Sequence, residues 1–264
     1  MTLLGTIVQS ILVAIFPPAF DRKKLLHALR RIYKSPVLFR GSYGIFYLLR
    51  GTNYIDARIM RHGIYEPASV RALLEQVRQR KADMFLDVGA NIGVYSLAVA
   101  KQGVCPRICA FEPDPHNKAQ LFANLFLNGW EERVQVFGDA VSDTDGTARM
   151  FAFRDPLHPS TGRSSLEGHE SSASIKSIPV RKIRLDDVFA DVAGRSIVVK
   201  MDIEGHEAKA LAGMKKLLSN NRIWLQVELL PLYADEIRAE LRVCGLVEQP
   251  QSVPGTSDFI FASG

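Results

Sequence analysis

Acidic side chains follow three successive apolar runs in the first half of the chain. These acids are Asp87, Glu112 and Asp139, at or just after the ends of the runs 84–88, 107–111 and 133–137. A carboxylate beside a buried strand is costly unless it meets a ligand, a hydrogen-bond donor or water. Three such acids in succession favour a ligand site. The alternative is that each one caps the helix or turn that follows it.

The loop after the first of these runs has only part of the glycine pattern of a dinucleotide-binding turn. That turn requires G-x-G-x-x-G, in which the second glycine lets the backbone approach a pyrophosphate. Here Gly89 is followed by Asn91 and Val94 at the second and third positions. A side chain at position 91 would crowd a pyrophosphate. The loop therefore disfavours NAD and favours a ligand without phosphate.

S-adenosylmethionine is a ligand of that kind, since it joins adenosine to an amino acid without a phosphate. Its carboxylate can lie at the positive end of the helix that follows the loop. Its ammonium group can meet Asp87, while Gly89 and Gly93 permit a tight turn and a close approach. We expect Glu112 to accept hydrogen bonds from the ribose diol and Asp139 to accept one from the adenine amine.

A second group of acids follows the fourth apolar run, in the sequence D-I-E-G-H-E. The candidates for chemistry are Asp202, Glu204 and Glu228, the last of them near the end of the fifth run. Transfer of a methyl group to a hydroxyl needs a base as the proton leaves. Asp202 or Glu204 can take that proton, with His206 as a weaker candidate. Alternatively, Asp202 and Glu228 could hold a divalent metal ion, although two carboxylates do not identify one. Glu207 fits the first turn of the next helix, where it would meet the macrodipole.

Strand–helix alternation from residue 84 onward would position these acids. The predicted strands are 84–88, 107–111, 133–137, 196–201 and 222–229, and the predicted helices between them include 93–102, 115–128 and 206–219. This alternation predicts an α/β fold with a parallel sheet and helices on both faces. Near the end, L-V-E-Q and D-F-I-F-A-S are too close in sequence for a helical crossover, so they predict an antiparallel pair at the sheet edge. Ligands bind outside the carboxyl ends of the strands in such a sheet, where the acids lie.

The N-terminal part differs from the rest of the chain in charge. Residues 1–82 carry fourteen Lys or Arg and four Asp or Glu, a net +10, and the remaining residues carry nineteen and twenty-four, a net −5. The apolar segment 3–16 is shorter than the ~20 residues that span a bilayer, and 22–34 predicts a basic amphipathic helix. This combination is typical of peripheral binding to a membrane surface through residues 1–34. The alternative is a helix that covers the core.

Several stretches of the sequence resemble the FkbM family of class I S-adenosylmethionine-dependent methyltransferases. They are IYEPASVRALLEQVRQRKADMFLDVGANIGVYSLAVA, FEPDPHNKAQLFANLFLNG, GDAVSDTDG, RLDDV and VVKMDIEGHEAKALAGMKKLL. The resemblance covers roughly residues 62–232, and its most specific pieces are D-V-G-A-N-x-G and D-I-E-G-x-E. It implies a Rossmann-like sheet of seven strands, mostly parallel with an antiparallel last strand. We therefore divide the chain into an N-terminal helical extension, residues 1–61, and a methyltransferase domain, residues 62–264.

The resemblance also implies an activity, O-methylation of a sugar or natural product. We predict an O-methyltransferase whose acceptor is a hydroxyl of a glycan, a lipid-linked sugar or a natural product. The predicted cofactor-binding residues are Asp87, Gly89, Ala90, Asn91, Gly93, Glu112, Pro113, Asp139 and Ala140. The predicted catalytic residues are Asp202, Glu204 and Glu228.

Other functions fit the sequence less well. An NAD-dependent oxidoreductase is disfavoured by the glycine loop, and no nucleic-acid partner is expected because no zinc-finger or RNA-recognition pattern is present. A membrane-recruited, non-catalytic protein that binds S-adenosylmethionine is disfavoured by the intact acids. The three cysteines have neither disulfide nor zinc spacing, which favours a reducing, cytoplasmic compartment, with residues 1–34 at the inner membrane face. Residues 155–177 predict a long loop, either a disordered insert or an active-site lid.

Overall fold

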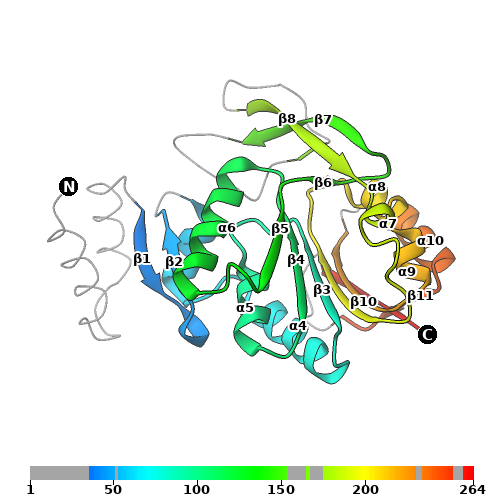
Figure 1. Cartoon of the computed structure of the whole chain (residues 1–264), viewed down its shortest axis with the longest axis horizontal. Helices are drawn as coiled ribbons and strands as arrows, with labels where there is room; N and C mark the ends of the chain where they lie inside the picture. Colours follow the sequence, from blue (N-terminus) through cyan, green and yellow to red (C-terminus); the bar gives the residue numbers. More distant parts are fainter. Residues whose placement is uncertain (1–35, 51–52, 154–164, 167–174, 230–233, 252–257) are drawn as a thin grey trace, which may run out of the picture.

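A computed structural model of the chain describes residues 36–50, 53–153, 165–166, 175–229, 234–251 and 258–264 (Figure 1). The apolar segment 3–16 and the helix predicted over 22–34 lie outside these ranges. Among the described residues, no helix is both long enough and apolar enough to cross a membrane.

Seven strands form the central sheet, in the order β11-β12-β10-β9-β3-β4-β5. Five of them coincide with the predicted apolar runs and pair in parallel: β3 (Met84–Val88), β4 (Arg107–Phe111), β5 (Val134–Phe137), β9 (Ser196–Met201) and β10 (Arg222–Glu228). The last strand, β12 (Asp258–Ser263), runs antiparallel to both β10 and β11 (Leu246–Gln249). The predicted antiparallel pair is therefore confirmed, and β11 forms the edge of the sheet.

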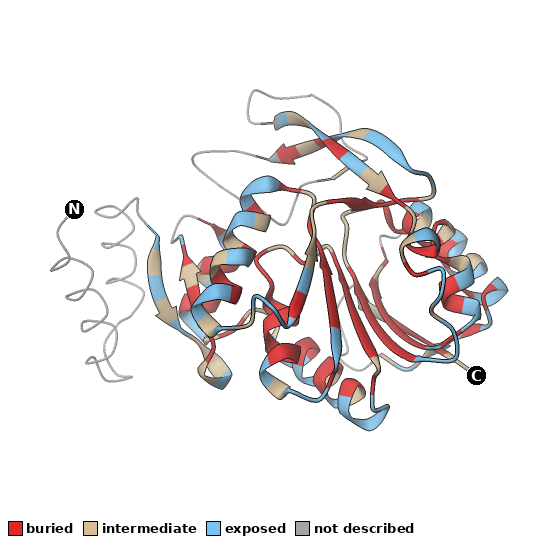
Figure 2. Cartoon of the chain, viewed as in Figure 1, coloured by how far each residue is buried: buried red, intermediate tan, exposed pale blue. Residues whose placement is uncertain are grey.

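Helices cover both faces of this sheet, as predicted. One apolar cluster joins it to α3 (Tyr54–His62), α4 (Pro67–Gln79), α5 (Val94–Gln102) and α6 (Pro115–Asn128). A second cluster joins the opposite face to α7 (Leu185–Val188), α8 (Glu207–Ala212), α9 (Lys215–Ser219) and α10 (Ala234–Val243). Figure 2 shows the strands of the central sheet almost wholly buried between these layers. Burial on both faces explains why the parallel strands are continuous apolar runs.

The single helix predicted over 206–219 is instead divided into α8 and α9. Gly213 separates them, and a Cβ atom placed on it would lie 1.9 Å from the carbonyl oxygen of Ser142. The backbone N–H of Asp186 also donates to the carbonyl of Gly213. The chain bends here because two other segments pack directly against its backbone, a contact that helical periodicity does not reveal.

The described part of the N-terminal region contains strands where a helical extension was expected. β1 (Val37–Arg40) pairs antiparallel with β2 (Phe46–Leu49), and the short 3-10 turn η1 (Ser42–Gly44) lies between them. Side chains of Gln120, Asn124 and Asn128 on α6 bind the backbone of β2, so its free edge has partners. Partly buried and exposed residues alternate along β1, as in a strand with one face on the protein and one face in solvent. The helical extension predicted over residues 1–61 is not confirmed: of its described part, the hairpin is not helical and α3 is, and residues 1–35 lie outside the described ranges. The domain boundary at residue 61 stays a prediction.

A smaller sheet above the carboxyl ends of the strands has no counterpart in the sequence analysis. It consists of β6 (Ala140–Val141), β8 (Ile175–Ile183) and β7 (Gly146–Phe153), in that order (Figure 1). β8 begins inside the segment 155–177 that was predicted as a loop. Of that segment, the structure describes residues 165–166 and 175–177.

Candidate active site

A cleft opens at the carboxyl ends of β3, β4, β5 and β9, as expected for an open α/β sheet. Its empty volume, open to solvent, is about 560 Å³. Eight of the twelve predicted site residues line it: Gly89, Asn91, Glu112, Pro113, Asp139, Ala140, Asp202 and Glu204. The structure therefore brings together residues that lie more than a hundred positions apart in sequence, such as Gly89 and Asp202. Asp87, Ala90, Gly93 and Glu228 are outside the lining.

The loop between β3 and α5 has a backbone that explains its glycines and its asparagine. Gly89 has φ = 85°, and a Cβ atom there would lie 1.9 Å from the carbonyl oxygen of Asp202. Gly93 caps α5 with φ = 91°, where a Cβ atom would lie 2.4 Å from Leu121. Asn91 also has a positive φ, 52°, which asparagine tolerates better than most residues. The loop therefore requires glycine at positions 89 and 93, where it contacts Asp202 and Leu121. Asparagine can occupy position 91 between them.

Asp87 has a different contact from the one expected. It is fully buried, and its Oδ2 accepts hydrogen bonds from the N–H and the hydroxyl of Ser96, at 2.9 and 2.6 Å. Burial raises the pKa of Asp87 to about 6, against the opposing effect of these hydrogen bonds. This carboxylate ties β3 to the first turn of α5. Ala90 and Gly93 likewise shape the turn beneath the cleft, and Ala90 donates its N–H to Phe111.

Glu112 lies at the wall of the cleft, where the ribose was expected. Its two carboxylate oxygens accept the N–H groups of Asn91 and Asp114, at 2.7 and 2.8 Å. Burial, together with the charge of Asp114, raises the pKa of Glu112 to about 8. The Asn117 side chain also hydrogen-bonds this carboxylate, which leaves acceptor capacity for one further hydrogen bond, such as one from a diol.

Asp139 is paired with a residue that the sequence analysis missed. The guanidinium of Arg181 on β8 donates to both oxygens of the Asp139 carboxylate, at 2.5 and 3.1 Å. This fork-shaped contact fixes the carboxylate at the end of β5 and attaches the small sheet to the cleft. Ser165 and Leu166, from the segment predicted as a loop, also line the cleft. The Ser165 hydroxyl donates to the carbonyl of Glu204 at 2.7 Å.

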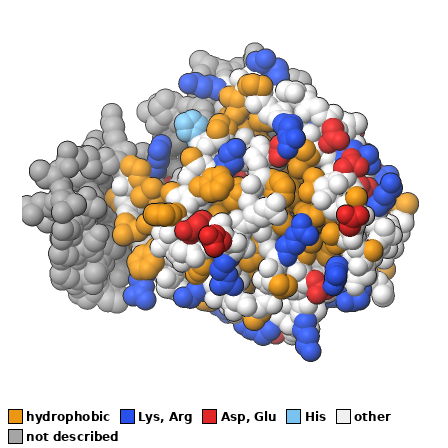
Figure 3. All heavy atoms as spheres, viewed as in Figure 1, with side chains coloured by type: hydrophobic (Ala, Val, Ile, Leu, Met, Phe, Trp, Pro, Cys, Tyr) orange, Lys and Arg blue, Asp and Glu red, His pale blue; other side chains and the backbone are white. Residues whose placement is uncertain are grey.

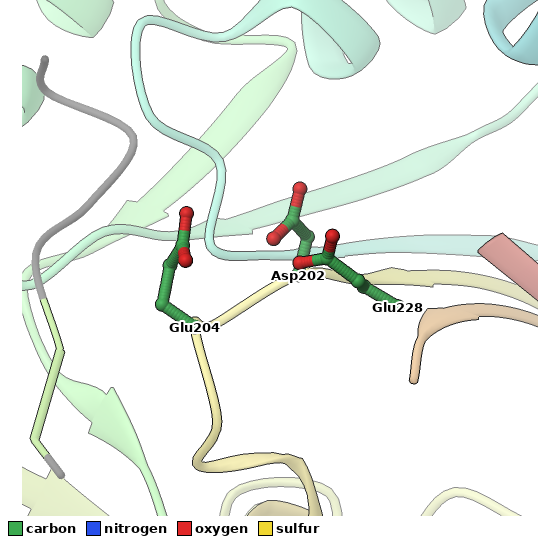
Figure 4. A group of neighbouring side chains, drawn as sticks. All are labelled: Asp202, Glu204 and Glu228. Atoms are coloured by element: carbon green, nitrogen blue, oxygen red, sulfur yellow. The ribbon is translucent and has the colours of Figure 1, made fainter. Parts of the chain in front are cut away.

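Three carboxylates gather at the ends of β9 and β10. Oxygen atoms of Asp202, Glu204 and Glu228 lie within 4.8 Å of one another. Figure 4 shows the carboxyl groups of Asp202 and Glu228 facing each other, with Glu204 beside them on the turn after β9. Three oxygen ligands at this spacing suit a hard divalent cation, and half-buried carboxylates can equally act as bases. Glu207 instead accepts the N–H groups of Ile203 and Gly205, so it stabilises the turn.

A buried lysine stands behind this acidic cluster, and it too was missed. The Lys200 side chain is 4% exposed, and its Nζ lies 3.1 Å from Asp258 and 3.5 Å from Asp202. Burial lowers the pKa of Lys200, but Asp202, Tyr95, Asp258 and Glu66 together raise it well above the ordinary value. The available sequence clue was a single charge inside the apolar run S-I-V-V-K-M. The lysine therefore fixes Asp202 from within the sheet.

His206 also lines the cleft, where its ring meets Ser142 rather than the acidic cluster. Its ring is buried, and Nε2 lies 3.0 Å from the hydroxyl of Ser142. That hydroxyl also donates to Asp143 at 3.0 Å. The same lining holds Val141, Met150 and Leu166. His206 thus belongs to the apolar end of the cleft.

Comparisons with known proteins bear on the family of this chain. A family model described as "Methyltransferase FkbM domain" matches residues 87–247. The chain is 27% identical to the 2-O-methyltransferase NoeI of Sinorhizobium fredii over 62% of this chain and 72% of that protein. It is 29% identical to the 31-O-demethyl-FK506 methyltransferase FkbM of Streptomyces tacrolimicus over 61% of this chain and 66% of that protein.

A solved structure, methyltransferase FkbM from Methylobacillus flagellatus KT, is 17% identical with a TM-score of 0.44. The match covers 69% of this chain and 44% of that one. Thus the matched segment spans less than two thirds of the length of that structure and of the Streptomyces protein. The family model alone covers more than half of this chain, with the acids of both groups inside it. The chain belongs to the FkbM family of methyltransferases.

Proposed function

We propose that this protein uses S-adenosylmethionine to methylate a hydroxyl group of a glycan, a lipid-linked sugar or a natural product. The observation that carries the proposal is a single cleft lined by two groups of acids, one for the cofactor and one for the chemistry. Glu112 and Asp139 follow β4 and β5, where an adenosine would bind, and Asp202 and Glu204 follow β9, on the other side of β3. The printed names of both curated relatives describe methylation at oxygen. Membership of a methyltransferase family argues against an NAD-dependent oxidoreductase.

The cofactor would lie across the ends of β3, β4 and β5. The ribose would bind Glu112, and the adenine amine would meet the carboxylate that Arg181 holds. The amino-acid end would lie over the loop at Gly89 and Asn91, near the N-terminus of α5, whose partial positive charge favours a carboxylate. Asp87 would act on this end only through the position of α5.

The methyl group would pass to the acceptor by in-line displacement at the sulfonium. Most of the rate gain in such a step comes from holding the attacking oxygen close to the methyl carbon. Asp202 or Glu204 would take the proton from the acceptor hydroxyl as the new bond forms. Lys200 holds the Asp202 carboxylate in place from the opposite side. A divalent ion held by Asp202, Glu204 and Glu228 would instead acidify the hydroxyl directly.

Ligand-induced stabilisation tests the cofactor assignment. S-adenosylhomocysteine should raise the Tm of the purified protein, because a ligand that binds the native state stabilises it. Glu112→Ala should reduce this rise, whereas Asp191→Asn, an exposed acid on the connection before β9, should not. An equal rise with NAD, or an unchanged rise in Glu112→Ala, would contradict the assignment.

Turnover tests the acidic cluster. Asp202→Asn and Glu204→Gln should leave the S-adenosylhomocysteine Kd unchanged and lower methyl transfer by roughly 10²- to 10⁴-fold. The acceptor can be found by mass spectrometry of glycans and lipids from cells with and without the gene, as a lost methyl group. If EDTA abolishes wild-type transfer and a divalent ion restores it, the metal mechanism replaces the simple base. Full activity in both variants would refute either mechanism.

Location is a further proposal. The described cysteines are all free and buried, which suits a cytoplasmic protein. Fractionation of cells that express the full chain would test it, and recovery from an oxidising compartment would overturn it.

A further inference from the structure

The position of Asp87 leaves the α-ammonium group of S-adenosylmethionine without the partner that the sequence predicted. The Asp87 carboxylate is directed to Ser96 and ties β3 to α5 instead. A cation that leaves water needs an opposite charge or hydrogen-bond acceptors in the protein. We therefore examined the other carboxylates around the loop at Gly89 and the N-terminus of α5, where the amino-acid end of the cofactor would lie.

Glu66 lies beside this end of the cleft. Tyr95, on the first turn of α5, donates its hydroxyl to Glu66 Oε2 at 2.8 Å. The Tyr95 ring lies 5.5 Å from Nζ of Lys200, which in turn lies 3.5 Å from Asp202. The backbone of Asp202 closely approaches Gly89. Glu66 is outside the lining of the measured cleft, but these contacts place its carboxylate next to the Gly89 end.

The backbone of Glu66 has a conformation that is costly for a residue with a side chain. Its φ of 49° and ψ of 55° lie in the left-handed region, which residues with a Cβ atom rarely adopt. Its side chain forms no capping hydrogen bond with α4, although that helix begins at the next residue. The carboxylate instead reaches Tyr95 on α5. Strained residues of this kind gather at ligand sites, where the surrounding structure holds them in place.

Negative charge exceeds positive charge around Glu66. Within the described residues, the charges of three carboxylates act on Lys200, those of Asp202, Asp258 and Glu66. Figure 3 shows acidic and basic side chains interspersed over the outer surface in view, where water can solvate both. Glu66 is only partly exposed, and burial raises its pKa against the opposing effects of Lys200 and the Tyr95 hydroxyl. A cationic ligand beside Glu66 would balance the excess charge.

We propose that Glu66 is a specificity-determining residue that binds the α-ammonium group of S-adenosylmethionine. Tyr95 would hold the Glu66 carboxylate in position, and the cofactor carboxylate would stay at the positive N-terminus of α5. Asp202 fits the ammonium less well, because Lys200 already lies 3.5 Å from it and the proposed reaction places it beside the acceptor. This inference rests on the proposed function, since it concerns the same cofactor.

Calorimetry of the full chain with two ligands tests this contact. The ligands are S-adenosylhomocysteine and its deaminated analogue, which lacks only the amino group. The wild type should bind S-adenosylhomocysteine about ten- to a hundredfold more tightly than the analogue, as expected for a hydrogen bond between charged groups. Glu66→Gln should lose most of this difference, because its amide can accept from Tyr95 but carries no charge. Glu75→Gln, an exposed acid on α4, is the matched control and should keep the difference.

Further variants separate this contact from a structural role. Glu66→Met, a second uncharged variant, should also lose the difference between the two ligands. Tyr95→Phe removes the hydrogen bond to Glu66 but keeps the carboxylate, so it should retain most of the difference, as should Asp202→Asn.

The opposite results have distinct meanings. If the Glu66 variants bind both ligands equally weakly relative to wild type, with the difference between the ligands intact, Glu66 is structural and the proposal is overturned. Unchanged affinities in these variants, or loss of the difference in Asp202→Asn, would overturn it as well. A wild type that binds the two ligands alike would overturn this inference alone, whereas a wild type that binds neither would refute the proposed function.

Discussion

Replacement of Lys200 by methionine removes the buried cation while nearly keeping the shape of the side chain. In the native protein the Lys200 ammonium binds Asp258 at 3.1 Å and Asp202 at 3.5 Å. The ring of Tyr95 also lies 5.5 Å from Nζ. After the change, Gln226, which donates to Asp258 at 2.8 Å, is left to stabilise that carboxylate. A buried negative charge therefore loses its cation.

The expected cost follows from the burial of each partner. Removing one member of a buried ion pair costs about 3–5 kcal/mol, because the other charge is left uncompensated. The Asp258 side chain is 13% exposed, so most of that cost applies to it. Asp202 is 36% exposed and solvent can screen it, so it adds little. We therefore expect a loss near the lower end of the range, about 3 kcal/mol.

Thermal denaturation followed by circular dichroism would measure this loss. A domain of this size changes its Tm by about 2–4 °C per kcal/mol, so Lys200→Met should melt about 6–12 °C below the wild type. The double variant Lys200→Met/Asp258→Asn should recover most of the loss, because the neutral amide can still accept from Gln226. Lys216→Met, an exposed lysine on α9, should change Tm little. Equal Tm in Lys200→Met and wild type, or strict additivity in the double variant, would refute the reasoning.

Three further changes test the cofactor cleft. Gly89→Ala should destabilise the protein by about 2–6 kcal/mol and abolish S-adenosylhomocysteine binding, because the new Cβ atom meets a carbonyl oxygen at a residue with positive φ. The control is Gly245→Ala, where φ is also positive but the Cβ atom would lie in open space. It should cost only about 1 kcal/mol in a denaturant titration. The pKa of Glu112 is raised to about 8 in the native state, so its contribution to stability is present at acid pH and is lost as the pH rises toward 8. The Tm of Glu112→Gln relative to wild type should therefore increase between about pH 5 and pH 9. A Tm difference between variant and wild type that does not change with pH would contradict this expectation. Arg181→Met should weaken S-adenosylhomocysteine binding about tenfold in calorimetry by freeing Asp139, while Arg149→Met on β7 should not; equal affinities would exclude the positioning role.

Local patterns in the sequence determined the main sheet and the position of the cleft at its strand ends. The runs that form β3, β4, β5, β9 and β10 are apolar throughout because both faces of a parallel sheet are buried. An acid at the end of such a run has few structural uses, so Glu112, Asp139 and Asp202 were found in sequence alone. Glycine at 89 was equally informative, since close approach of backbone to backbone excludes other side chains.

Tertiary structure alone decided which of these acids face the cleft and which partners hold them. Asp87 follows the same pattern as Glu112, yet its carboxylate turns to Ser96, because the first turn of α5 packs against it. Arg181 reaches Asp139 across 42 residues and Lys200 reaches Asp258 across 58, and neither pair has a periodic signature. The break at Gly213 likewise depends on a remote backbone contact, and the strand pair near residue 40 depends on side chains of α6 that bind β2. Hydrophobic periodicity in the sequence predicts which face of a segment is buried. Which other segment packs against that face depends on the tertiary structure.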